Sequence, residues 1–306
     1  MKKYIYIIVI STCMLAQELI TPIPININVD EKKAELGNKL FHDKRLSKNN
    51  TISCSSCHII NEGGDDNRAV SYGINGLKGT RNSPTVLNAT FNTSQFWDGR
   101  SSDLREQAIG PIHNPVEMGS SFQEIIEKLK KDNFYIKRFS MIYDDGITEN
   151  NIIDAIVEYE NTLITPNSKF DKYLKGDKNI LTKKEKEGFQ LFKEYGCISC
   201  HNGVNIGGNI MQKLGVFETF ETTDFGKYNI TKNEEDKFYF KVPSLRNIQQ
   251  TSPYFHNGLT STLRDAVNKM AFHQVGYILD KEETDKIILF LKTLDGEMSF
   301  LEKTYE

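Results

Sequence analysis

The spacing of apolar residues along the chain predicts helices with one buried face. In two stretches these residues recur three or four positions apart, which is the period of an α-helix. The first stretch contains Ile152, Ile153, Ile156, Val157 and Leu163. The second, near the end of the chain, contains Ile287, Ile288, Leu291 and Leu294. We expect both stripes to lie in hydrophobic cores.

Capping boxes mark the beginnings of three helices, at residues 121–124, 182–185 and 280–283. In each, a hydroxyl or carboxylate side chain precedes a glutamate by three positions, so that each side chain can bond the other residue's backbone N–H. Loops are expected to dominate residues 59–95 and 202–262. The chain therefore predicts a mainly α fold with extensive loops.

The composition is that of a soluble globular chain with two domains. Its 306 residues are 38% hydrophobic and 26% charged, and this length suffices for two cores of ordinary size. Lys and Arg number 38 against 41 Asp and Glu, which gives a net charge of −3 without a basic stripe. A nucleic-acid partner is therefore not expected.

The first sixteen residues have the layout of a secretory signal peptide. Lys2 and Lys3 precede an apolar run over residues 4–10, and small residues follow as far as Ala16. This run is too short for a transmembrane anchor, and no later segment is apolar enough to be one. We expect a periplasmic protein whose net charge becomes −5, because the two lysines leave a chain of charge −3. A lipid anchor at Cys13 is less favoured because threonine precedes it.

Two Cys-x-x-Cys-His motifs, at residues 54–58 and 197–201, are the chemical centre of the sequence. Two thiols at this spacing can bond the two vinyl groups of one haem, and the histidine then lies under the iron as an axial ligand. The predicted groups are Cys54, Cys57 and His58 for one haem c and Cys197, Cys200 and His201 for the other. The alternatives are a four-cysteine zinc site, which needs no histidine after each pair, and disulfides, which are strained at this spacing.

The two haem motifs belong to an internal repeat. Residues 84–106 align without gaps on residues 243–265, at a constant offset of 159. The shared residues are Pro84, Asn88, Phe96, Gly99, Ser102, Leu104 and Arg105, matched by Pro243, Asn247, Phe255, Gly258, Ser261, Leu263 and Arg264. After the signal peptide (1–16), we therefore expect an N-terminal haem domain over residues 17–164, a linker over 165–180 and a C-terminal haem domain over 181–306.

A difference between the two copies separates the roles of the haems. Met270 in the second copy corresponds to Pro111 in the first. A thioether is a common sixth ligand that raises the iron potential, so we predict His201/Met270 coordination, with a core methionine as the alternative. The first copy has no equivalent ligand, although His113 or Met118 could coordinate. An open sixth position is the simpler interpretation, and it predicts one catalytic haem and one electron-relay haem.

With these motifs, the sequence resembles the bacterial di-haem cytochrome c peroxidase family, which includes the MauG-like proteins. The resemblance runs from about residue 30 to residue 296. Its motifs are CSSCH, RNSPTVLN (81–88), FWDGR (96–100), EQAIGPIHNPVEM (106–118), TPNSKFDKYLKGD (165–177), CISCH, KVPSLRNI (241–248) and TSPYFHNG (251–258). It implies that the N-terminal haem is the low-potential peroxidatic centre and that the C-terminal haem takes up electrons at high potential.

The resemblance also implies roles for single residues. Gln107 and Glu117 match the polar pair that lines the distal peroxide pocket, and Trp97 matches the tryptophan between the haems. A carboxylate there can move a proton between the peroxide oxygens, and an amide can orient the peroxide. Without the resemblance, Glu117 would also fit a solvated carboxylate and Trp97 a core aromatic. Asn82 and Thr251 match residues that hold a calcium ion between the domains, and so does Pro253.

One position departs from the family pattern. Many members close the peroxidatic haem with a distal histidine in the loop after the first motif, and Ile74 stands at the expected position. Isoleucine cannot ligate iron, so we predict a constitutively open haem, with Tyr72 as the nearest substitute ligand. MauG-like proteins also lack this histidine but use a tyrosine on the second haem, where this chain has Met270. The chain is therefore closer to the peroxidases.

The sequence thus predicts a peroxidase that reduces H2O2 to water with electrons from a small cytochrome c or similar donor. The resemblance implies a homodimer. One alternative is a non-catalytic di-haem electron carrier, which a hidden sixth ligand on the first haem would favour. The other is a MauG-like oxidase that modifies a protein or a small organic substrate, which the absence of Met270 from the second iron would favour.

Overall fold

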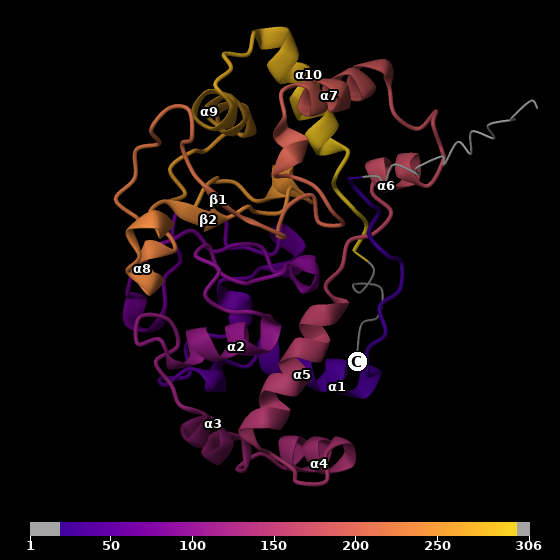
Figure 1. Cartoon of the computed structure of the whole chain (residues 1–306). Helices are drawn as coiled ribbons and strands as arrows, with labels where there is room; N and C mark the ends of the chain where they lie inside the picture. Colours follow the sequence, from indigo (N-terminus) through magenta and orange to yellow (C-terminus); the bar gives the residue numbers. More distant parts are fainter. Residues whose placement is uncertain (1–18, 299–306) are drawn as a thin grey trace, which may run out of the picture.

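The computed structural model describes residues 19–298, so the predicted signal peptide and Cys13 lie outside the described residues. The helices of the N-terminal half are α1 (Glu31–Phe41), α2 (Leu104–His113), α3 (Phe122–Leu129), α4 (Asn133–Ile142) and α5 (Glu149–Thr162). Those of the C-terminal half are α6 (Lys169–Leu174), α7 (Lys183–Glu194), α8 (Tyr228–Thr231), α9 (Leu263–Val275) and α10 (Lys281–Lys292). Figure 1 shows the two halves one above the other. The predicted mainly α fold is confirmed.

A small sheet and short 3-10 turns complete the structure. Strands β1 (Met211–Lys213) and β2 (Tyr239–Lys241) pair antiparallel, with Met211 opposite Lys241. Loops and 3-10 turns occupy most of residues 59–95 and 202–262, as predicted. Within residues 19–298, no helix is both long and apolar enough to cross a membrane.

The predicted helix starts and buried stripes are confirmed. Ser121, Thr182 and Asp280 cap α3, α7 and α10, each in a reciprocal capping box with the glutamate three positions on. The stripe on α5 buries Ile152 and Ile156 in a core with α1 and α3. The stripe on α10 and just beyond it buries residues in the C-terminal core, namely Ile287, Leu291 and Leu294. Local pattern and tertiary packing agree at these helices.

The repeat extends from sequence to packing. Helix α1 packs across α5, and α7 packs across α10 in the same way (Figure 1). A glycine permits each approach, because a Cβ on Gly37 would lie 1.8 Å from the Ala155 carbonyl oxygen and one on Gly188 would lie 1.9 Å from that of Lys286. Helices α2 and α9 begin at equivalent positions, 159 residues apart. The two halves therefore offer the same scaffold to the two haem motifs.

The segment expected to be a linker, residues 165–180, contains a short helix and packs on the C-terminal half. Helix α6 begins at a capping box formed by Ser168 and Asp171, and Asp171 forms a fully buried ion pair with Arg246 at 2.7 Å. Arg246 lies 75 residues further along the chain. The loop-like composition of this segment did not reveal that partner.

Candidate di-haem active site

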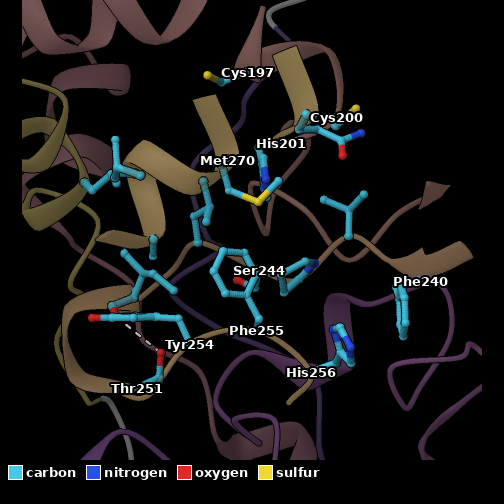
Figure 2. Close-up of a pocket in the computed structure, with 18 of the residues that line it drawn as sticks. Cys197, Cys200, His201, Phe240, Ser244, Thr251, Tyr254, Phe255, His256 and Met270 are labelled. Atoms are coloured by element: carbon cyan, nitrogen blue, oxygen red, sulfur yellow. Dashed lines mark hydrogen bonds between the residues drawn. The ribbon is translucent and has the colours of Figure 1, made fainter. Parts of the chain in front are cut away.

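Each Cys-x-x-Cys-His motif opens into its own cavity. The N-terminal cavity, of about 590 Å³, is lined by Cys54, Cys57 and His58. The C-terminal cavity, of about 240 Å³, is lined by Cys197, Cys200, His201 and Met270 (Figure 2). The four cysteines form no disulfide, and because the pairs line different cavities they cannot share one zinc ion. No cluster of three or more His, Cys, Asp or Glu with metal-binding geometry occurs within residues 19–298.

The local backbone places the histidine of each motif directly after its thiols. A 3-10 turn holds each cysteine pair, and the N–H groups of His58 and His201 bond back to the first cysteine of their motifs at 3.0 Å. The two Nδ1 atoms donate to the carbonyl oxygens of Gly64 and Ile206, at 3.1 and 3.4 Å. A carbonyl oxygen can only accept, so Nε2 of each ring carries no proton and is available to iron.

Burial sets the charge state of these groups. It lowers the pKa of His58 and that of His201, the latter to about 4, so both imidazoles are neutral, as iron ligation requires. Burial also raises the pKa of the Cys54 thiol to about 12 and that of Cys197 to about 11. The thiols are therefore protonated when no metal or haem is bound. These residues fit two covalently attached haems.

Gln107 and Glu117 both line the N-terminal cavity. Gln107 lies on α2, and Glu117 lies in the turn that follows this helix. The Glu117 carboxylate accepts a hydrogen bond from the Asn114 amide at 2.7 Å, and burial raises its pKa. Among the described residues, the Gln107 side chain has no hydrogen-bond partner. The cavity thus holds an amide free to donate and a carboxylate whose proton affinity is increased.

Two candidate sixth ligands of the N-terminal iron are committed to other contacts. His113 is exposed, packs edge-on against Phe122 and does not line the cavity. Met118 does line the cavity, but it is also buried in the hydrophobic core that contains Ile112 and Ile125. Among the described residues that line this cavity, His58 is the one histidine.

In the loop that would carry a distal histidine, the side chains of Tyr72 and Ile74 do not reach the cavity. Ile74 is buried, its N–H donates to the Glu117 carbonyl at 2.8 Å, and its side chain packs beside Gly119. Tyr72 is exposed, with the Arg68 guanidinium over its ring. Neither side chain lines the cavity.

Equivalent helices place different residues against the two cavities. Met270 on α9 lines the C-terminal cavity, and Figure 2 shows its sulfur in front of the His201 ring. Pro111, at the same position of α2, lines the N-terminal cavity. A thioether therefore faces one cavity where a side chain without a donor atom faces the other.

Trp97 lies between the cavities and lines both. Its indole N–H donates to the Asn82 carbonyl at 2.9 Å, and its ring meets His256 edge-on. His256, the repeat equivalent of Trp97, stacks on Phe240 and bonds the Thr222 hydroxyl at 2.8 Å. These contacts fix the indole across the boundary between the two haem sites.

The residues expected to hold calcium lie together. Asn82, Thr251 and Pro253 all line the C-terminal cavity. The Asn82 amide nitrogen donates to the Arg68 carbonyl, and its side-chain oxygen accepts no hydrogen bond from any described residue. Asp65, which the sequence did not single out, lines the same cavity. It is 1% exposed, and neither carboxylate oxygen has a hydrogen-bond partner within residues 19–298. Burial beside Asp66 raises its pKa to about 7. A cation would satisfy these oxygens.

Two more buried ionisable groups line the cavities. Glu160 continues the apolar face of α5 and lines the N-terminal cavity, where burial raises its pKa to about 8. Its place four residues after Ile156, on a buried stripe, was the signal that could have identified it. Lys241 on β2 lines the C-terminal cavity. Its sequence context carries no comparable signal.

Comparison with known proteins gives two family matches. Residues 31–179 match the di-haem cytochrome c peroxidase family, and residues 185–295 match cytochrome c. The chain is 49% identical to cytochrome c551 peroxidase of Nitrosomonas europaea, over 93% of this chain and 86% of that protein. It is 48% identical to cytochrome c peroxidase Ccp of Escherichia coli over 91% of its length, but spans only 61% of that protein. Among solved structures, a MauG-like protein associated with microbial copper homeostasis has a TM-score of 0.81 at 27% identity, with 94% of this chain and 96% of that one covered.

Proposed function

Because the chain belongs to the di-haem cytochrome c peroxidase family, we propose that it reduces H2O2 to water at the N-terminal haem. The reaction takes two electrons and two protons per peroxide and releases two waters. The observation that carries this assignment is the contrast between Pro111 and Met270 at one position of the repeat. A haem iron without a protein sixth ligand can bind peroxide and supply the redox chemistry that breaks its O–O bond.

Glu117 would transfer a proton within the peroxide, and Gln107 would bind it through a hydrogen bond. Glu117 would accept a proton from one peroxide oxygen and return it to the other, which departs as water. Burial raises the pKa of Glu117 toward neutral pH, and a group that both accepts and returns a proton works best with a pKa near the working pH. The Gln107 amide donates a hydrogen bond that orients the peroxide and stabilises negative charge as it develops. The bond from Asn114 keeps the carboxylate pointed into the cavity.

A haem held at the C-terminal site would supply the electrons for this reduction. His201 and Met270 would be the axial ligands there, and this coordination favours electron uptake from a small cytochrome c or similar donor. Trp97, which lines both cavities, provides the aromatic bridge between the sites. MauG-like oxidation is disfavoured because a methionine, not a tyrosine, faces the second haem and because the peroxidases are the more similar relatives.

Calcium would join the two halves through Asn82, Thr251 and Pro253, with the buried charge of Asp65 nearby. Addition of calcium to chelator-treated protein should raise its thermal stability, by about 2.7 kcal/mol at a hundred times the dissociation constant. Isothermal titration calorimetry would give the stoichiometry, and absence of binding would contradict the site.

The predicted export signal favours a periplasmic protein, and the resemblance favours a homodimer. We propose both.

Optical and EPR spectroscopy of the pure oxidised protein, followed by H2O2, tests the function. We expect one high-spin haem beside one low-spin His/Met haem, with immediate consumption of peroxide. Two low-spin haems that react only after half reduction would contradict the open site. Two low-spin haems that stay inert after half reduction would contradict the peroxidase itself and leave an electron carrier.

A further inference from the structure

Lys241 is a buried cation without a partner. Its side chain is 6% exposed, and no hydrogen bond or ion pair to its ammonium group occurs among the described residues. Burial alone lowers its pKa, to about 8, and no carboxylate contributes to the shift. A buried ammonium is costly unless an opposite charge lies beside it. No residue between 19 and 298 supplies that charge.

The position of Lys241 indicates what does. It lines the C-terminal cavity, and its N–H donates to the Trp97 carbonyl at 2.8 Å, so it lies on the side that faces the other haem site. Figure 2 shows Cys197 and Cys200 at one end of this cavity and Phe240, the neighbour of Lys241, at the other. The cysteines bond the vinyl edge of a haem. The propionates project from the edge remote from the vinyl groups, and therefore toward the Phe240 end.

We propose that Lys241 is the counter-ion of a propionate of the C-terminal haem and thereby raises the reduction potential of that haem. A positive charge near the haem favours the reduced state, which carries one more electron, and the low dielectric of the cavity strengthens the effect. Lys241 is thus a positioning and potential-setting residue at the end of the electron path nearest Trp97. The inference rests on haem binding at residues 197–201 and not on peroxide chemistry.

Spectroelectrochemical titration of the pure di-haem protein, without peroxide, tests this role through the low-spin haem. In Lys241→Met, which keeps the length of the side chain but removes its charge, the equilibrium constant for reduction should fall about tenfold, or about 59 mV for one electron. Lys241→Arg should stay near the wild-type potential because it keeps the charge. Lys213→Met is the matched control, since Lys213 lines the same cavity but is exposed, so solvent screens its charge.

Three results would overturn the proposal: an unchanged potential in fully loaded Lys241→Met, an equal fall in Lys213→Met, or an equal fall in Lys241→Arg. If Lys241→Met loads haem poorly, Lys241→Gln is measured in the same way. If neither uncharged variant retains the C-terminal haem, haem content becomes the readout. Full loading of Lys241→Arg then supports the charge requirement, and poor loading of all three variants contradicts it.

Discussion

The two haem cavities are built on one repeat but differ in the groups that face them. Helices α2 and α9 begin at equivalent positions, and the same site on each presents Pro111 to one cavity and Met270 to the other. The N-terminal cavity is the larger, about 590 against 240 Å³, and holds Glu117. One position of a shared scaffold thus presents a thioether to one cavity and a side chain without a donor atom to the other.

The buried charges of the two cavities differ as well. The N-terminal cavity contains the acids Glu117 and Glu160, whose pKa values burial raises, whereas the C-terminal cavity contains the base Lys241 in addition to the acid Asp65. Arg246, in the C-terminal core, corresponds through the repeat to Leu87, which packs in an apolar cluster of the N-terminal half. The duplicated fold therefore tolerates a buried charge in one half where the other half has an apolar residue at the equivalent position.

Among the changes predicted here, loss of the Glu117 carboxylate should have the largest effect, and it should lower the rate of peroxide turnover. Glu117→Gln is expected to lower kcat with H2O2 by about 10²–10⁴-fold, because the amide cannot accept the proton. Steady-state assays with a reduced cytochrome donor measure this. The wild-type rate should also fall toward acid, from a pH above the ordinary glutamate pKa of 4.5, because burial raises the pKa of the group that must be ionised.

Glu106→Gln is the control for this prediction, since Glu106 lies on α2, the helix that precedes Glu117, but is exposed and accepts a hydrogen bond from the Ser102 N–H. Its rate should stay near that of the wild type. A Glu117→Gln enzyme that keeps full activity and the same acid limb would show that another group moves the proton.

The Arg246–Asp171 pair is expected to dominate stability in the C-terminal half. Arg246→Leu introduces the residue found at the repeat position in the other half but leaves the Asp171 charge buried alone. We expect a loss of about 3–5 kcal/mol in the free energy of unfolding. Urea denaturation of the holoprotein, followed by circular dichroism, measures this.

The matched comparison is Arg264→Leu, which breaks the exposed pair with Asp285. Its expected cost is about 0–1 kcal/mol. Equal losses in the two variants would mean that the buried pair has no special role in holding α6 against the C-terminal half.

A substitution that makes the N-terminal cavity resemble the C-terminal one should have the smallest effect, but it tests the difference between the cavities most directly. Pro111→Met places a thioether at the position of Met270, so the N-terminal haem should change from high spin to low spin. If the thioether occupies the iron in about nine of ten molecules, peroxide turnover falls about tenfold. EPR and kinetic assays on the same sample report the spin state and the turnover.

Ile109→Met is the control. It adds a methionine to α2 where the side chain packs on the core and not on the cavity, so it should change neither the spin state nor the turnover. A high-spin signal retained in Pro111→Met would show that the two helices are not equivalent toward their irons.

Local signals in the sequence determined the haem motifs, the helix starts and the repeat. A Cys-x-x-Cys-His motif needs only five consecutive residues to present its thiols and imidazole, and a capping box needs four, so neither depends on distant partners. The buried stripes of α5 and α10 follow from the helical period alone. The roles of Gln107 and Glu117 came instead from the resemblance, and the structure places both on one cavity.

The tertiary structure decided which charges are buried and what lies between the haems. Asp171 meets Arg246 across 75 residues, and this pairing gives order to a segment whose composition resembles a linker. Asp65 and Lys241 have ordinary sequence surroundings. They became candidates only because folding buries both at the C-terminal cavity, where no described side chain forms an ion pair with either. Burial and charge pairing depend on residues far apart in the chain, so a pattern of near neighbours cannot encode them.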